Sequence, residues 1–495
     1  MAILSTDLIR QGAAGASTGY TINNSIRFND GDDPVLYKSI SSTSTSTTNT
    51  ISMWVKRSKL GNSDSGSGSD AYGQTLFQSG RTASNYMELK FGGATAGGLG
   101  TAENALSLYN VTGDSINMKI NTNAVFRDVS AWYHIVAIFD TTNGISFDRL
   151  RLYVNGVRQT SFSSSTIPSA STATEMFNNT SNTPSIGAVK NTSETVRHFD
   201  GYLAEINVVN GYAYGPEYFG EFQEDTDIWI PKKYSGSYGT NGFYIKGSDS
   251  SSLGTDSSGN GNNFTTSGLA SNDQKTDTPT NNMITFNPLN NQRSGGTPSN
   301  GNLDYVGPGT RTLISLTANI PSTGKWAIAF KVAQVSTNVG WQFGITKTTN
   351  SNFGDAAGSN EDVGASDGIA MSPSSSDLQL YDSANSTSID PSLPITTSDE
   401  FWIAVDMATG KVFLGIYDES ATSMKFVAAD TGLDGNPATG DNPTATISDM
   451  IGSDEYVFAV GSKQTSQHIY LQRSTDVSGT TPTGYTYFEN VKDLL

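Results

Sequence analysis

The stretch FRDVSAWYHIVAIFD, residues 126–140, limits the folds open to this chain more than any other. It contains eleven consecutive uncharged residues, 129–139, mostly large and apolar, in a sequence otherwise rich in serine, threonine, asparagine and glycine. A continuous apolar run of this length is typical of a strand buried on both faces. Neither face of such a strand would carry a pair of side chains that could act together in catalysis. We therefore expect a central strand with Trp132, His134, Val136 and Ile138 on one face and Tyr133, Ile135, Ala137 and Phe139 on the other.

Two hairpins are predicted from local patterns. Asn155 and Gly156 separate two apolar strands, and an Asn-Gly pair is a strong hairpin signal because a type I′ turn needs positive φ at both positions. Leu150, Leu152 and Val154 should face the core, and this hairpin should pair with the central strand. The second hairpin is FWIAVDMATGKVFLGIYD, residues 401–418, with Phe401, Ile403 and Val405 on one strand and Val412, Leu414 and Ile416 on the returning one.

Length and composition favour an all-β protein with two antiparallel β-sandwich (jelly-roll) domains joined by an irregular connector. The 495 residues are too many for one ordinary domain. A hydrophobic content of 35%, a charged content of 15% and 51 glycines suit many short strands joined by turns. The predicted segments are an N-terminal anchor at 1–20, a first sandwich at 21–222, a packed Gly-, Asn- and Pro-rich connector at 223–300 and a second sandwich at 301–495.

Charge and residue usage exclude several classes of partner and chemistry. A formal net charge of −18 repels nucleic acids and anionic membranes, so we expect no nucleic acid partner and no membrane insertion. The chain has no cysteine and three histidines, which excludes disulfides and thiol catalysis and leaves almost nothing for a transition-metal site. The N-terminus lacks a signal-peptide pattern, so we expect a soluble protein made in the cytoplasm without export.

The sequence does not predict an enzyme. No E-x-D-x-x-E run supplies the paired carboxylates that a jelly-roll glucanase needs. Glu205 stands alone in a strand, where a hydrogen-bonded structural role is expected, and His134 lies in an apolar strand as a core residue. A polysaccharide depolymerase is an alternative only if its catalytic site is formed by residues from more than one subunit.

One loop could hold calcium. In DSSGNGNNF, Asp256, Ser258 and Asn260 offer oxygen ligands at alternate positions, with glycines that allow the backbone to curl round a cation. Ser267 stands where a calcium loop would have its bidentate acidic residue. The alternative is a structural turn in which asparagine, aspartate and glycine are used for their backbone geometry.

Three tyrosines could bind a sugar. Tyr212, Tyr214 and Tyr218 follow the last strand of the first predicted sandwich in a glycine-containing loop. Sandwich proteins bind pyranose rings against tyrosine or tryptophan faces, together with polar groups from loops. The alternative is that these tyrosines pack against the connector.

The first domain resembles the laminin-G-like, concanavalin-like jelly roll. The resemblance is carried by TISMWVKR, AWYHIVAIFD, LRLYVNGV, SIGA and GYLAEINVV, in the expected order over about 200 residues. The wider set, which includes SIRFND, FDGYLAEINVVNG, GTDSSGNGNNFT and TDTPTNNMITFNPL, resembles virion-associated proteins of marine tailed bacteriophages. In that group the segment around DTPTNN commonly precedes a second module.

The second module resembles a SPRY-type sandwich. GKWAIAFKV is similar to its opening strand, and WQFGIT, FWIAVDMATGKVFLGIYD and GNPATG follow. Ala327 departs from the pattern, because an aromatic residue is common after Gly-Lys-Trp. The resemblance implies a structural or adhesive role, with binding by loops at one rim of a sandwich.

These resemblances imply a virion surface protein on the tail or capsid exterior. The leading expectation is a tail fibre or spike adhesin that binds host-surface glycans and contacts other virion proteins through residues 1–20. A homo-oligomer is expected, and a trimer by analogy with fibres. The alternative is a non-catalytic capsid-decoration or tail-structural subunit that contacts only other virion proteins.

Overall fold

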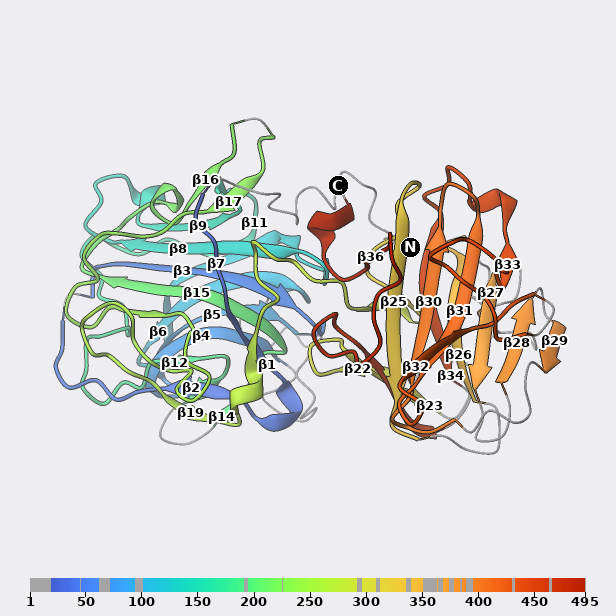
Figure 1. The fold of residues 1–495 in the computed structure, drawn as a ribbon. Helices are drawn as coiled ribbons and strands as arrows, with labels where there is room; N and C mark the ends of the chain where they lie inside the picture. The colour runs from blue at the N-terminus through green and yellow to red at the C-terminus, as the bar shows by residue number, and fades with distance from the viewer. Residues whose placement is uncertain are drawn as a thin grey trace. The chain divides into compact units, whose positions relative to one another are not determined.

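The computed structural model divides the chain into two compact units, and the division falls between Asn282 and Met283. We call residues 10–282 the first unit and residues 283–495 the second unit (Figure 1). The structure describes residues 19–44, 46–61, 72–93, 101–190, 195–224, 226–291, 296–308, 312–334, 340–349, 363, 368–373, 378–382, 385–388, 395–429, 432–462 and 465–494. The predicted anchor, residues 1–20, lies almost entirely outside them.

The first unit is a sandwich of two antiparallel sheets, the β3 sheet and the β5 sheet, each named after one of its strands. The β3 sheet contains, in order, β10 (Val157–Arg158), β9 (Leu150–Val154), β8 (Trp132–Asp140), β3 (Thr48–Arg57), β15 (Gly201–Asn210), β1 (Ser25–Phe28) and β20 (Gln274–Lys275), with β18 (Phe243–Ile245) beside β15. The β5 sheet contains β11 (Phe162–Thr166), β7 (Ser115–Val125), β6 (Ala105–Thr112), β5 (Asn85–Gly92), β4 (Gly73–Thr82), β12 (Ser185–Ile186), β2 (Val35–Tyr37) and β19 (Thr265–Ser267). Two further strand pairs are β13 (Val189–Lys190) with β14 (Thr195–Val196) and β16 (Gly220–Phe222) with β17 (Trp229–Pro231).

The apolar stretch is a central strand, as predicted. β8 lies between β3 and β9, and both pairings are antiparallel. Ile135, Ala137 and Phe139 belong to the core between the two sheets. On the other face Trp132 packs with a second cluster of aromatic side chains, so the strand is buried on both sides.

The Asn155-Gly156 hairpin is also confirmed. Asn155 has φ 48° and Gly156 has φ 76°, which is the backbone geometry of the predicted type I′ turn. Val157 pairs with Val154 across it. Glycine is favoured at position 156 for a second reason, because a Cβ atom there would overlap the ring of Trp229.

The predicted connector, residues 223–300, does not behave as one segment. Its first part packs on the first unit, where β18 pairs with β15, β19 with β2 and β20 with β1. Its last part supplies β21 and β22 to the second unit. The composition indicated irregular structure, but it carried no signal for backbone pairing with strands more than 200 residues away in sequence.

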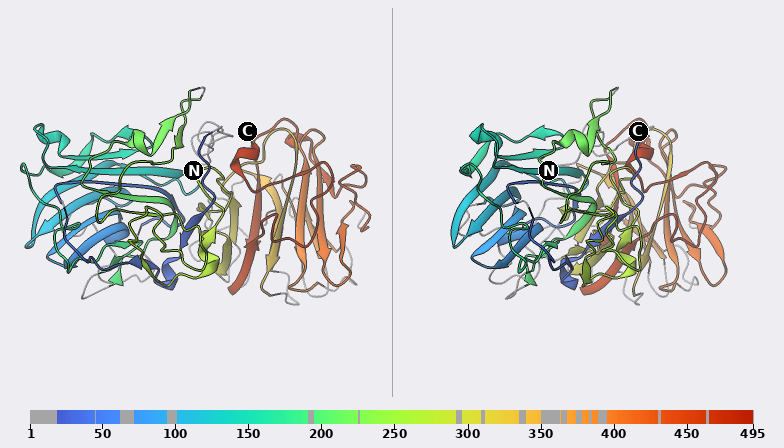
Figure 2. Two further views of the ribbon diagram at one scale, coloured as in Figure 1. Left: turned by 60° about the vertical axis from the view of Figure 1, so that its left-hand side comes forward. Right: turned by 90° about the vertical axis from the view of Figure 1, so that its left-hand side faces the viewer.

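The second unit is also a sandwich of two sheets, named the β34 sheet and the β25 sheet, whose strands run side by side in Figure 2. The β34 sheet contains β21 (Phe286–Asn291), β24 (Thr312–Leu316), β34 (Tyr456–Ser462), β26 (Trp341–Lys347), β27 (Ile369–Pro373), β28 (Leu378–Asp382) and β29 (Asn385–Ser388). The β25 sheet contains β22 (Thr297–Ser299), β23 (Asp304–Pro308), β35 (Thr465–Leu471), β25 (Lys325–Val332), β30 (Glu400–Asp406), β31 (Lys411–Asp418) and β32 (Ser423–Phe426), with β33 (Ala445–Thr446) beside β31 and β36 (Thr486–Tyr487) beside β25.

The second predicted hairpin has the expected register. In the β30–β31 pair Phe401 lies opposite Ile416, Ile403 opposite Leu414 and Val405 opposite Val412. The other face of β30 is buried as well, because Trp402 and Ala404 pack with Tyr485 and Tyr487 near the end of the chain.

The all-β class is confirmed. The only helices among the described residues are short 3-10 turns, and none of them is long and apolar enough to cross a membrane. These turns are η1 (Asp30–Asp32), η4 (Ser146–Asp148), η5 (Pro216–Tyr218), η6 (Ser271–Asp273), η8 (Ser448–Met450) and η9 (Val491–Leu494).

Candidate functional site

The three predicted sugar-binding tyrosines come together in a stacked row after β15. The rings of Tyr212 and Tyr214 are nearly parallel, with centroids 5.3 Å apart and an interplanar angle of 4°. The rings of Tyr214 and Tyr218 stack at 4.4 Å. Tyr212 is 41% exposed and Tyr218 is 45% exposed, whereas Tyr214 is half-buried. We call these three residues the tyrosine row.

The backbone at the start of the row is fixed by a buried threonine of β3. The Thr50 hydroxyl accepts a hydrogen bond from the Tyr214 N–H at 2.9 Å and lies 3.1 Å from the carbonyl oxygen of Tyr212, to which it donates. Gly211, with φ 91°, donates its N–H to the Thr48 carbonyl oxygen. The loop is therefore attached to the central part of the β3 sheet from its first residues.

The end of the row is held by the connector. The 3-10 turn η5 begins with Pro216, whose ring fixes φ for the first helical position. Phe219, directly after the turn, is buried and stacks on Tyr234 at 4.9 Å. The strand pair β16–β17 follows at once, and its hairpin projects beyond the neighbouring strands in all three views (Figures 1 and 2).

Tyr214 contacts both the row and the connector. Its ring lies 6.0 Å from that of Tyr234, within a cluster that also contains Tyr238 and Tyr244. Packing against the connector, the alternative to sugar binding, therefore applies to Tyr214. Connector packing accounts for Tyr214, and it leaves large parts of Tyr212 and Tyr218 in solvent.

One carboxylate lies beside the row. Glu217 is exposed, and a Cβ atom added to Gly215 would overlap its carboxylate, so that group lies directly over the Gly215 backbone. The next acidic residue, Glu221, forms an ion pair with Lys232 at 3.2 Å. Glu217 was not singled out from the sequence, although its place between Tyr214 and Tyr218 was a usable signal.

Trp229 of β17 packs on the β3 sheet through His134. Its Nε1 donates a hydrogen bond to His134 Nδ1 at 2.9 Å, and the two rings stack. Because an indole nitrogen only donates, Nδ1 accepts and the ring proton is on Nε2, 2.9 Å from the Ser52 hydroxyl. Burial lowers the pKa of His134 to about 3, so the ring is neutral at pH 7. His134 is thus a hydrogen-bonded core residue.

The predicted calcium ligands come together in a loop whose polar groups bond to one another. Asp256 Oδ1 accepts hydrogen bonds from the N–H groups of Tyr244 and Ser258. Asp256 Oδ2 accepts from the Ser258 hydroxyl and from the Asn262 N–H. The amide nitrogen of Asn260 donates to the carbonyl oxygens of Gly239 and Gly242.

This arrangement has the geometry of the structural turn that was the alternative to calcium. Both carboxylate oxygens of Asp256 already have hydrogen-bond donors, which a cation would have to displace. In the described part of the chain no group of three or more His, Cys, Asp or Glu residues could hold a metal ion. Calcium binding by Asp256, Ser258 and Asn260 stays a prediction.

Glu205 occupies a position that the sequence did not reveal. It has φ 51°, and it lies where the register of β15 against β3 shifts between Ala204 and Asn207. Its carboxylate accepts hydrogen bonds from Tyr244 at 2.5 Å and Tyr20 at 3.0 Å. Burial is the main cause of a raised pKa for Glu205. The carboxyl group is buried under tyrosines, as expected for a structural residue.

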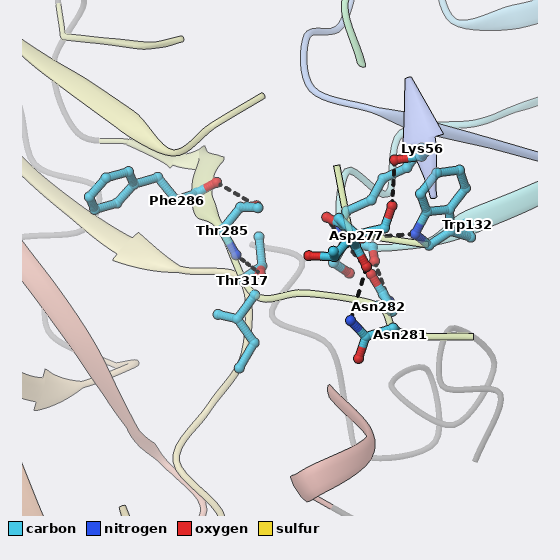
Figure 3. Close-up of polar contacts among 12 residues, drawn as sticks. Lys56, Trp132, Asp277, Asn281, Asn282, Thr285, Phe286 and Thr317 are labelled. Atoms are coloured by element: carbon cyan, nitrogen blue, oxygen red, sulfur yellow. Dashed lines mark hydrogen bonds and ion pairs between the residues drawn. The ribbon is translucent and has the colours of Figure 1, made fainter. Parts of the chain in front are cut away.

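The DTPTNN motif fastens the end of the first unit to its central strands. The fully buried Lys56 of β3 donates to Asp277 Oδ2 and to Asn282 Oδ1, both at 2.8 Å. Trp132 of β8 donates to the other Asp277 oxygen at 3.0 Å, and Figure 3 shows these side chains converging on Asp277. Breaking such a buried ion pair by removing one partner is strongly destabilising. The motif therefore has a structural role.

Comparison with known proteins gives one family match. Residues 29–214 match the model of the concanavalin A-like lectin/glucanases superfamily. No curated protein matches the chain.

Solved structures that resemble the chain do so at low similarity. The TRIM65 PSpry domain has 8% identity and a TM-score of 0.28, with 39% of this chain and 92% of that one covered. A proposed carbohydrate-binding protein from Bacteroides ovatus has 16% identity and a TM-score of 0.31, covering 50% of this chain and 58% of that one. Mouse laminin α1 domains LG4-5 have 10% identity and a TM-score of 0.29, covering 97% and 90%.

The family match agrees with the fold of the first unit. It begins directly after β1 and ends at Tyr214, so it includes two members of the tyrosine row and excludes Tyr218 and the connector. Within the first unit, residues 29–214 are therefore similar to the concanavalin A-like lectin/glucanases superfamily.

Proposed function

We propose that the protein is a non-catalytic bacteriophage virion protein, a tail fibre or spike adhesin that binds host-surface glycans through the tyrosine row. The observation that carries the glycan proposal is the exposure of Tyr212 and Tyr218 on a fixed backbone. Aromatic side chains normally bury most of their surface, and an exposed, ordered aromatic face fits the apolar face of a sugar ring.

The rigidity of the loop supports the same proposal. Thr50 fixes the backbone of Tyr212 and Tyr214, and β16 pairs with β17 directly after Phe219. A preformed site loses less conformational entropy when it binds a ligand than a mobile loop does. A weakly binding aromatic surface can therefore become an effective adhesive site, especially when several copies act together.

The virion part of the proposal rests on the sequence resemblance to virion-associated proteins of tailed bacteriophages. In this proposal residues 1–20 contact other virion proteins, the sandwiches face outward from tail or capsid, and the protein forms a homo-oligomer, a trimer by analogy with fibres. The absence of an E-x-D-x-x-E run in the sequence supports adhesion without hydrolysis.

A second candidate is a capsid-decoration or tail-structural subunit, and one surface favours it. Ile145, Phe147 and Val157 are all more than half exposed. They lie near one another at the β10 edge, because Arg158 donates to the Phe147 carbonyl oxygen and pairs with Asp148. An exposed apolar group next to an edge strand is a surface that another protein subunit can cover.

The glycan proposal is tested by replacing Tyr212 and Tyr218 together with alanine in the full chain. We expect binding to a glycan array and to host cells to fall at least tenfold, because each lost stacking face contributes about 1 kcal/mol. The matched control is Phe147→Ala, which removes an exposed aromatic ring outside the row. Equal loss in both variants, or binding that survives the double substitution, would contradict the proposed site and favour the second candidate.

A further inference from the structure

The charged side chains around the tyrosine row differ in whether they have an ion-pair partner. Lys232 pairs with Glu221 at 3.2 Å. Lys233 follows it and is exposed. Glu217 differs from Glu221, because no cation pairs with its carboxylate within the described part of the chain.

The Glu217 charge lies at the row itself. Its carboxylate covers Gly215, the residue that separates Tyr214 from η5, and Tyr218 ends that turn. A sugar ring stacked on the exposed part of Tyr218 would therefore be close to the negative charge of Glu217. The field of the whole chain, with a formal net charge of −18, has the same sign.

We propose that the tyrosine row selects uncharged glycans, and that Glu217 excludes chains with carboxylate or sulfate groups. This inference rests on the proposed glycan-binding function and adds the substrate class. The stacking surface is indifferent to charge, since every pyranose has an apolar face. Specificity then comes from repulsion of the wrong ligand, which is a common way to discriminate between similar partners.

The size of the effect follows from electrostatics in water. One anionic group about 4 Å from the Glu217 carboxylate should weaken binding about fivefold. Repulsion between exposed charges is screened over about 8 Å at physiological salt, so the discrimination should shrink as salt is added.

The test uses the full chain and matched pairs of polysaccharides. The probes are soluble glucan, mannan and galactan, each with its carboxymethylated derivative, so that the sugar stays the same and only the charge changes. The wild-type protein should bind at least one parent polysaccharide, and the carboxymethylated form of that polysaccharide at least fivefold more weakly. Glu217→Gln should reduce this difference severalfold and leave binding of the parent unchanged.

A charge-removal control separates the local effect from the net charge. Asp114 lies exposed in the turn between β6 and β7 of the β5 sheet with φ 63°, a conformation that asparagine adopts readily. Asp114→Asn should bind the parent and carboxymethylated polysaccharides with the same difference in affinity as the wild type. If Asp114→Asn and Glu217→Gln reduced the difference in affinity between the parent and carboxymethylated polysaccharides equally, the proposed role of Glu217 would be overturned.

The failure of the inference and the failure of the proposed function give different results. If charged and uncharged forms bind equally and both depend on Tyr212 and Tyr218, the row binds glycans but the substrate class is wrong. If neither form of any probe binds, and host cells are not bound either, the glycan function itself is wrong. Circular dichroism and a thermal melt of each variant confirm that it is folded.

Discussion

The tyrosine row and the Asp256 loop are both polar, glycine-containing segments of the first unit, yet they use their side chains in opposite ways. In the Asp256 loop the carboxylate accepts four hydrogen bonds from its own surroundings. In the row, backbone groups make the hydrogen bonds and ring surface is left in solvent. The difference shows that a candidate ligand residue is best judged by the bonding capacity it has left, because a satisfied side chain has little to offer a ligand.

The largest effect that would test this comparison is expected at Asp256. Asp256→Ala leaves the N–H groups of Tyr244, Ser258 and Asn262 without their acceptor, so the free energy of unfolding should fall by about 3 kcal/mol. Urea denaturation measures the change. Calcium and chelators should leave the wild-type melting temperature unchanged. A calcium-dependent rise in that temperature which disappears in Asp256→Ala would show that the loop holds the cation after all.

A smaller effect is expected from pH at the His134 stack. Since the folded pKa is about 3, below the usual 6.5, the unfolded chain binds a proton that the folded chain does not. Stability from this group is present above pH 6.5 and is lost as the pH falls from 6.5 towards 3. Between pH 6.5 and 4.5 the loss should be about 2 to 3 kcal/mol.

The reference for this measurement is His134→Gln, because glutamine can still accept from Trp229 and donate to Ser52 but does not titrate. The free energy of unfolding should depend less steeply on pH in the variant than in the wild type over that range. If the unfolding free energy depended on pH equally in the wild type and the variant, His134 would be protonated in the folded protein over this range as it is in the unfolded chain.

The smallest effect on stability is expected at Thr50, which links the sheet to the row. Thr50→Val keeps the shape of the side chain and removes its hydroxyl, which leaves the Tyr214 N–H without its acceptor. We expect a loss of about 1 to 2 kcal/mol in unfolding free energy. Glycan affinity should fall while Tyr212 and Tyr218 are still present. Unchanged affinity would show that the row does not depend on a fixed backbone.

The features predicted correctly from sequence are those encoded by neighbouring residues. The alternation in β8, the Asn155-Gly156 turn and the register of β30 against β31 depend on side-chain period and turn chemistry. Their physical causes lie within a few residues of the feature, so a local pattern was enough.

The features that were missed depend on contacts between distant segments. Trp229 lies 95 residues from His134, and the sequence contains no local sign that the two stack. The same holds for Glu205, whose positive φ accompanies a change of register against β3 that no residue pattern marks. The tyrosine row is an intermediate case, because its residues were identified but its stacking and exposure needed the fold.

The hydrogen bonds of the DTPTNN motif determine where the chain enters and leaves the first unit. Thr278 and Thr280 donate to the carbonyl oxygen of Ile22, and Ser25 donates to that of Asp277. The chain thus enters and leaves the first sandwich at neighbouring points. A module whose two ends meet can be inserted into another protein, permuted or exchanged between chains with little rearrangement of its interior.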